Sequence, residues 1–274
     1  MSSIVEKAMG RSPPERRGDS SAVVPAIPKA AQPRLPVADR PPVALRSLLM
    51  LDSSPMLARD FRFLKRPVLA RVFGMSRSAP KGGNLVMLTS DLPHAGKSFI
   101  ALNLAASMAS EQMTRVVLID ADPARRTLSS RLGIDDCPGM LDLLAAEARD
   151  VAEVLLATDV ESLYVMSAGR PRQDATELLA GPRMGQILKS FNDANTVVLL
   201  DSPPLLLSSE GRVLADQANH ALVVVEAGRS TAGDVGQVLQ LLKGTNVTVS
   251  LVLNKAPASG HSRYKEYYYP YTQD

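Results

Sequence analysis

The sequence predicts an α/β fold in which a doubly wound, mainly parallel sheet is flanked by helices. From residue 84 onward, short apolar segments alternate with stretches of helical length. Several of the apolar segments are rich in Val, Leu and Ile, which is typical of strands buried on both faces of a parallel sheet. Regular alternation of strands and helices favours a three-layer arrangement with helices on both faces of the sheet.

Each expected element follows from these patterns of apolar residues and helix-forming stretches. The expected strands are Leu85–Thr89, Val116–Ile119, Leu163–Met166, Val197–Leu200, Leu222–Val225 and Val247–Leu253. The expected helices between them cover residues 97–112, 139–147, 183–192, 208–217 and 231–243.

The N-terminal part differs in composition from the α/β region. Residues 10–46 carry eight prolines and predict a disordered linker, and residues 2–9 have the spacing of a short amphipathic helix. Residues 55–73 predict a further helix, which Pro67 should break or kink. We therefore expect a mostly disordered extension over 1–54, a domain over 55–260 and a tail over 261–274. The apolar face of the helix over 55–73 consists of Leu57, Phe61, Leu64, Val68 and Val72.

Composition and charge exclude several classes of protein. The chain has 274 residues, 45% of them apolar, which suits one large domain with an extension. Cys137 is the single cysteine, which excludes an internal disulfide and a cysteine-cluster metal site. No apolar run reaches the roughly 18 residues of a membrane span, and the first residues are charged where a signal peptide is apolar, so we expect a cytoplasmic protein.

The basic charge is confined to the N-terminal region. Residues 1–80 hold fourteen Lys/Arg and six Asp/Glu, a net +8, although the whole chain carries only +3. Such a region attracts anionic lipid headgroups, nucleic acid or an acidic partner, or is simply a solvated linker.

A phosphate-binding loop is the strongest motif. Gly96-Lys97-Ser98 follows an expected strand and opens an expected helix, as in GxxxxGK[ST], although Asp91 replaces the first glycine. In such a loop, backbone N–H groups cradle phosphates, the lysine reaches the β- and γ-phosphates and the serine hydroxyl coordinates Mg²⁺. The motif predicts a fold of the P-loop NTPase type and a site that binds ATP and Mg²⁺. The residues expected at the nucleotide are Pro93, His94 (through its backbone N–H), Ala95, Gly96, Lys97, Ser98 and Phe99.

Two further expected strands end in carboxylates. One runs into Asp120 and Asp122, and the other ends at Asp201. Ligands of such sheets bind beyond the carboxyl ends of the strands, so these groups should converge with Ser98 on one Mg²⁺. We assign Asp201 the Walker B role, and Asp120 contact with Mg²⁺ or acceptance of a proton.

The tail concentrates hydroxyl groups. Five of the six tyrosines lie in the last eleven residues, in a polar segment without apolar periodicity. An ATP site followed by this row of phenols suggests an enzyme that phosphorylates its own tail. These tyrosines are Tyr264, Tyr267, Tyr268, Tyr269 and Tyr271.

The segments SDLPHAGKSF, VVLIDADPARR and VVLLDSPPLLLSSEG, followed by a tyrosine-rich tail, resemble the bacterial tyrosine kinases. The resemblance covers about residues 55–274. It implies that Asp120, Asp122 and Arg125 form a Walker A′ box and that Asn254, within LVLNKA, faces the adenine base. Residues 175–184, ATELLAGPRM, are similar to a segment that precedes a helix in this family.

The resemblance also implies a biological role. It indicates an autokinase that works with a membrane polysaccharide co-polymerase or chain-length determinant as activator, with a phosphotyrosine phosphatase as its opponent, and without nucleic acid. Tail phosphorylation would regulate exopolysaccharide polymerisation and export from the inner face of the membrane. SSIVEKAMG and FRFLKRP are similar to an exosortase-associated subgroup. Family members form rings through a Glu-x-x-Arg-x-x-Arg helix, which Arg59, Arg62 and Lys65 match only in part.

Two alternatives remain open from the sequence. A partitioning or division-site ATPase carries a signature lysine at the position of Leu92, and Lys81 lies too early to replace it. A kinase-inactive, ATP-binding regulator of polysaccharide synthesis is the other alternative, because His94 stands where the family has glycine.

Overall fold

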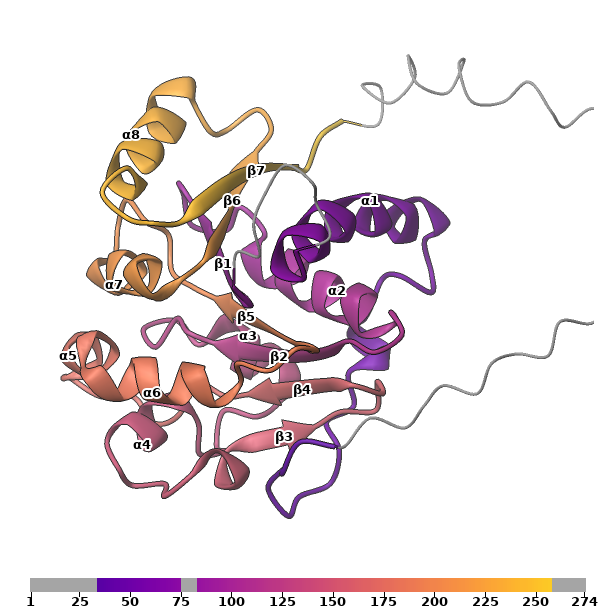
Figure 1. Cartoon of the computed structure of the whole chain (residues 1–274). Coiled ribbons are helices and arrows are strands. Elements are labelled where there is room, and N and C mark those ends of the chain that lie inside the picture. The colour runs from indigo at the N-terminus through magenta and orange to yellow at the C-terminus, as the bar shows by residue number, and fades with distance from the viewer. Residues whose placement is uncertain (1–33, 75–82, 258–274) are drawn as a thin grey trace, which may run out of the picture. The chain divides into compact units, whose positions relative to one another are not determined.

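The computed structural model describes residues 34–74 and 83–257 (Figure 1). The expected helix over residues 2–9 and the tyrosine tail lie outside the described residues. No helix within the described ranges is long and apolar enough to cross a membrane.

A seven-stranded sheet forms the centre of the fold and confirms the predicted α/β class (Figure 1). Its order is β3-β4-β2-β5-β1-β6-β7, and every neighbouring pair is parallel except β3 and β4. The six expected strands are all present, whereas β3 was not predicted. The strands are β1 Leu85–Ser90, β2 Arg115–Asp120, β3 Leu155–Ala157, β4 Leu163–Met166, β5 Thr196–Asp201, β6 His220–Glu226 and β7 Thr248–Asn254.

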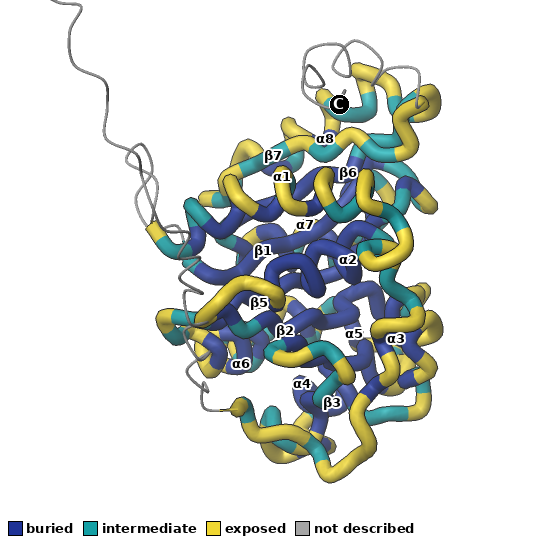
Figure 2. Tube along the Cα trace, turned by 90° about the vertical axis from the view of Figure 1, so that its right-hand side faces the viewer, coloured by how far each residue is buried: buried dark blue, intermediate teal, exposed yellow. Residues whose placement is uncertain are grey.

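Helices cover both faces of the sheet. One core lies between the sheet and α1, α2 and α3, and the other lies between the sheet and α4 to α8. Val86 and Leu88 face the first core and Leu85 and Met87 the second, as the period of two in a strand requires. Figure 2 shows the buried strands running through the middle of this domain. The helices are α1 Pro55–Val72, α2 Lys97–Ala109, α3 Thr127–Leu132, α4 Met140–Leu144, α5 Ala175–Ala180, α6 Pro182–Ser190, α7 Ser209–Gln217 and α8 Ala232–Leu242, with 3-10 turns at Arg46–Leu48 and Val151–Glu153.

Residues 34–54 belong to the folded domain, which corrects the expected boundary at residue 55. Ala38 N donates to Leu155 O at 2.8 Å and Val43 N donates to Ala157 O at 2.9 Å, so this segment lies along the outer edge of β3. Leu45 is fully buried. The prolines of this segment predict disorder, but proline is also compatible with a segment that pairs at the edge of a sheet.

Helix α1 continues through Pro67 instead of ending there. Pro67 costs the helix one hydrogen bond, but Val68, Leu69 and Val72 beyond it are buried in the core shared with α2. Tertiary packing of this face therefore outweighs the local effect of the proline.

Lys65 of α1 points into the domain rather than toward solvent. Its side chain is 5% exposed, and its Nζ donates to Ser107 O at 2.7 Å and pairs with Glu111 at 2.7 Å. These contacts tie α1 to the end of α2, so Lys65 has a structural role here. Of the three ring-helix positions, only Arg59 and Arg62 are exposed.

We expect Lys65→Met to lower the free energy of unfolding by about 1–3 kcal/mol, because the buried Ser107 carbonyl loses a charged donor. Urea unfolding measures this change. The matched control is Arg62→Met on the exposed side of the same helix, which should stay within about 0.5 kcal/mol of the parent. Equal effects of the two substitutions would contradict the structural role of Lys65.

Candidate functional site

The loop between β1 and α2 has the backbone of a phosphate-binding loop. Gly96 has φ +100°, and a Cβ there would lie 2.2 Å from Nδ2 of Asn254, so this position requires glycine. His94 also lies in the left-handed region, with φ +62°, where glycine is favoured. The backbone at position 94 thus favours glycine, and the histidine adopts it at some strain.

Lys97 lies at the start of α2 as the motif predicts. It is 7% exposed, and burial lowers the pKa of its ammonium, against the opposing effects of Asp201 and Asp122. The two carboxylates favour the charged form of Lys97 and so partly oppose the effect of burial. Lys97, Ser98 and Gly96 line a hollow of about 180 Å³.

Asp201 and Asp120 end adjacent strands and are direct register partners across β5 and β2. Burial is the main cause that raises the pKa of Asp201 to about 7, and the nearby Asp120 adds to it. The Ser98 side chain lowers the pKa of Asp201 and so opposes these effects, and Asp201 Oδ1 is buried without a hydrogen-bond partner among the described residues. Ser98 and Asp201 thus offer hard oxygen ligands, the type that Mg²⁺ prefers.

Asp120 makes structural contacts that the sequence did not indicate, and its expected role at Mg²⁺ or as a proton acceptor stays a prediction. Its Oδ2 accepts hydrogen bonds from the N–H and the hydroxyl of Ser129, both at 2.7 Å, and its Oδ1 accepts from Asp122 N at 3.2 Å. Asp120 therefore holds α3 against the end of β2. Ser129, which the sequence did not single out, in turn accepts from Ala168 N at 3.0 Å.

The expected convergence of three carboxylates is not seen as a ready-made cluster. Within residues 34–74 and 83–257, no group of three or more His, Cys, Asp or Glu side chains could hold a metal ion. A site built on Ser98 and Asp201 would instead be completed by water and phosphate oxygens, which is common for Mg²⁺.

Asp122 and Arg125 face the phosphate hollow. Both line it, together with Arg131 of α3, which the sequence did not indicate. Asp122 Oδ1 accepts from Arg125 N at 3.2 Å, and burial raises the pKa of Asp122. The hollow thus combines two arginines and Lys97 with one carboxylate, a charge pattern suited to a polyphosphate.

A second hollow of about 440 Å³ shares one lining residue, Phe99, with the first. Apolar side chains of α1, α2 and β7 line it, with Asn254 at one edge. Asn254 lies beside the phosphate loop, where its Nδ2 donates to Ala95 O at 2.7 Å. A polar hollow and an apolar hollow on the two sides of Phe99 suit the phosphate and base ends of a nucleotide.

The pKa of Asp201 predicts a specific pH dependence in the nucleotide-free protein. A carboxyl whose pKa is raised from 3.8 to about 7 contributes stability below pH 4 that is lost as the pH rises toward 7. Relative to the parent, Asp201→Asn should gain about 2–4 kcal/mol in unfolding free energy between pH 4 and 7. Urea unfolding across this range measures the gain, and exposed Asp216→Asn is the control. If the unfolding free energies of the parent and of Asp201→Asn changed with pH in the same way, the raised pKa of Asp201 would be contradicted.

Known proteins resemble this chain in sequence and in fold. No family model matches the chain. EpsB of Ralstonia solanacearum is 36% identical over 202 residues, which cover 70% of this chain and 27% of that protein. The tyrosine-protein kinase wzc of Salmonella typhimurium is 28% identical over 194 residues, again 70% of this chain and 27% of that protein. The chain thus spans about a quarter of the length of these relatives.

The solved structures agree with these relatives. The kinase domain of Escherichia coli tyrosine kinase ETK matches with a TM-score of 0.61 and 28% identity, covering 68% of this chain and 72% of that one. The septum site-determining protein MinD of Pyrococcus horikoshii, complexed with Mg-ADP, matches with a TM-score of 0.53 and 21% identity over 66% of this chain and 76% of that one, which shows the fold alone. The P-loop domain of this chain therefore belongs to the bacterial tyrosine kinase family.

Proposed function

We propose that the protein is an ATP-dependent tyrosine autokinase whose acceptors are the tail tyrosines Tyr264–Tyr271. The observation that carries the proposal is the coupling of a nucleotide-type site, centred on Lys97 and Asp201, with five tyrosines in the last eleven residues. The relatives that bear tyrosine-kinase names support the reaction class.

In the proposed reaction, a tail phenol oxygen attacks the γ-phosphorus of ATP in line. The bond from that phosphorus to the β–γ bridging oxygen breaks, ADP leaves with the electron pair, and the phenol proton passes to a carboxylate. Asp122 suits this last role because it faces the phosphate hollow, whereas both oxygens of Asp120 already accept hydrogen bonds. Phosphoryl transfer depends mainly on positioning and charge neutralisation.

Lys97 and Arg125 would neutralise phosphate charge from the protein side. Mg²⁺, held by Ser98 and Asp201, would supply further neutralisation of the β- and γ-phosphate oxygens when bound. The apolar hollow beside Phe99 would receive the adenine base, with Asn254 at its edge.

The regulatory setting is part of the same proposal. A membrane polysaccharide co-polymerase or chain-length determinant would activate the kinase at the inner face of the membrane. A phosphotyrosine phosphatase would reverse the tail modification, and subunits would phosphorylate one another within a homo-oligomer. Cycles of phosphorylation would then tune exopolysaccharide polymerisation and export. Inward-facing Lys65 leaves Arg59 and Arg62 for a ring contact, so the ring would be weaker than a full Glu-x-x-Arg-x-x-Arg helix allows.

One observation favours a second candidate, a kinase-inactive ATP-binding regulator. His94 occupies a left-handed position that suits glycine, and this strain bears on the phosphate loop itself. Such a regulator would bind Mg-ATP without forming phosphotyrosine. The tyrosine tail would then have no chemical use.

Lys97→Met should abolish tail phosphotyrosine in protein incubated with Mg-ATP and, where needed, with a partner's cytoplasmic segment. The loss should exceed about 100-fold, because removing a fixed charge at the transferred phosphoryl group typically costs that much. Mass spectrometry of the tail measures it, with Lys81→Met as a control expected to behave as the parent. Persistent phosphotyrosine in Lys97→Met would refute the site assignment.

Phosphorylation should also reduce the mass of the oligomer. Each phosphate adds roughly −1.5 to −2 charges at neutral pH, so several on one tail repel acidic groups of a neighbouring subunit. Light scattering of phosphorylated and unphosphorylated protein tests this change. Equal masses would show that the tail does not control assembly.

A further inference from the structure

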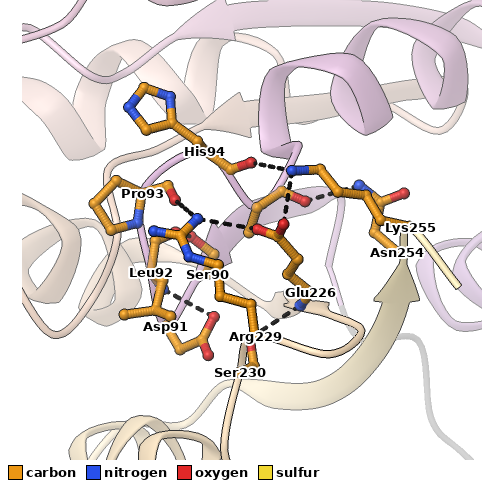
Figure 3. Close-up of polar contacts among 11 residues, drawn as sticks. Ser90, Asp91, Leu92, Pro93, His94, Glu226, Arg229, Ser230, Asn254 and Lys255 are labelled. Carbon is orange, nitrogen blue, oxygen red and sulfur yellow. Dashed lines mark hydrogen bonds and ion pairs between the residues drawn. The ribbon is translucent and has the colours of Figure 1, made fainter.

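Three consecutive carbonyls of the phosphate loop are held from outside the loop (Figure 3). Arg229 donates to Pro93 O at 2.8 Å and Lys255 donates to His94 O at 2.9 Å. Asn254 donates to Ala95 O at 2.7 Å. The donors come from the segment after β6 and from the end of β7, two elements distant in sequence from the loop.

Glu226 joins the two cations of this arrangement. Its Oε1 accepts from Lys255 at 2.9 Å and its Oε2 accepts from Arg229 at 3.1 Å. The Glu226 side chain is only 13% exposed, and its backbone N–H donates to the Ser230 hydroxyl at 3.0 Å. Glu226 thus orients both donors toward the loop, as Figure 3 shows.

The geometry of the peptide bond gives these contacts a consequence for phosphate binding. In a trans peptide, C=O and N–H point in opposite directions. Holding the carbonyls of Pro93, His94 and Ala95 therefore fixes the N–H groups of the residues that follow each of them, so that they point away from Arg229 and Lys255. Within the described residues, the N–H groups of His94, Ala95 and Gly96 donate to no protein acceptor. Successive free N–H groups in a loop that mixes right- and left-handed residues form an anion-binding concavity.

We propose that Arg229 and Lys255, joined by Glu226, form together with Asn254 a carbonyl clamp that presets the loop amides for the nucleotide phosphates. Arg229, Asn254 and Lys255 contact the loop and Glu226 contacts two of them, so all four are positioning residues that act on the phosphates through the loop. The proposal rests on the nucleotide site of the proposed function and adds to it the residues that keep the site ready before binding.

The clamp also accounts for the tolerance of His94 in the loop. A histidine at φ +62° favours other backbone conformations. The bond from Lys255 to the His94 carbonyl holds that residue in place, while its imidazole ring points away from the clamp contacts (Figure 3). Without the clamp, the loop would sample conformations in which the N–H groups of His94, Ala95 and Gly96 no longer converge on the phosphate position.

The solvent exposure of Arg229 and Lys255 distinguishes a positioning role from a role in the stability of the fold. The side chains of Arg229 and Lys255 are 45% and 47% exposed, and exposed ion pairs contribute little to global stability. Their loss should therefore change phosphate binding much more than the melting temperature. A residue that only stabilised the fold would change the melting temperature and all ligands together.

The test measures affinities of the full chain for Mg-ADP and AMP by competition with a fluorescent ADP analogue. We expect Arg229→Met/Lys255→Met to weaken Mg-ADP binding about tenfold, because charged hydrogen bonds contribute on this scale. AMP affinity should change by less than about twofold, since AMP lacks the phosphate that occupies the loop centre. Lys255→Arg should retain most of the affinity, and Glu226→Gln, which keeps the side-chain volume, should give an intermediate loss. Exposed Lys243→Met and Arg212→Met are the matched controls.

Three results would overturn the clamp. The first is an unchanged affinity of the double variant for Mg-ADP. The second is an equal loss of affinity for Mg-ADP and for AMP in that variant. The third is a parent protein that does not bind Mg-ADP. If the double variant does not fold, Glu226→Gln and Lys255→Arg decide the question alone. Mg-ADP binding with the predicted losses, but without tail phosphotyrosine, would refute the proposed kinase reaction and leave the clamp supported.

Discussion

The site depends on the burial of opposite charges at the carboxyl ends of adjacent parallel strands. Lys97 and Asp201 lie out of water, with Asp120 directly beside Asp201 in the sheet. Burial destabilises each charged form, which is why the lysine pKa falls and the aspartate pKa rises. The sheet order places β1, which leads into the loop before Lys97, next to β5, so the charge of Lys97 partly offsets that of Asp201. Asp120, on β2 at the other side of β5, has the opposite effect on Asp201.

This arrangement divides the carboxylates by their surroundings rather than by their sequence motif. Asp120 and Asp122 lie two residues apart in one motif, yet the first holds Ser129 of α3 and the second faces the phosphate hollow. One carboxylate oxygen of Asp201 has no hydrogen-bond partner among the described residues, and the Ser98 side chain lowers the pKa of this carboxyl. In the proposed reaction, Asp120 would hold α3, Asp122 would accept the proton and Asp201 would bind the cation.

The parts of the fold that were predictable depend on local sequence. Buried strands such as β1 and β5 are continuous apolar runs, and the Gly96-Lys97-Ser98 motif determines the strand–loop–helix that contains it. Strand β3 was missed because three residues carry too little pattern, and residues 34–54 because their prolines hid a segment that pairs with β3. Ser129, Arg131 and Arg229 reach the site only through tertiary packing, which no local pattern encodes.

The central claim is that the site transfers phosphoryl groups to the chain's own tail. The most direct test is to incubate the purified protein with Mg-ATP, with and without a membrane partner's cytoplasmic segment, and to map phosphotyrosine while quantifying released inorganic phosphate. Our account predicts phosphate on the tyrosines of the tail and none on Tyr164, which is buried at the β4 strand. Consumption of ATP with all phosphate released into solution and an unmodified tail would contradict it.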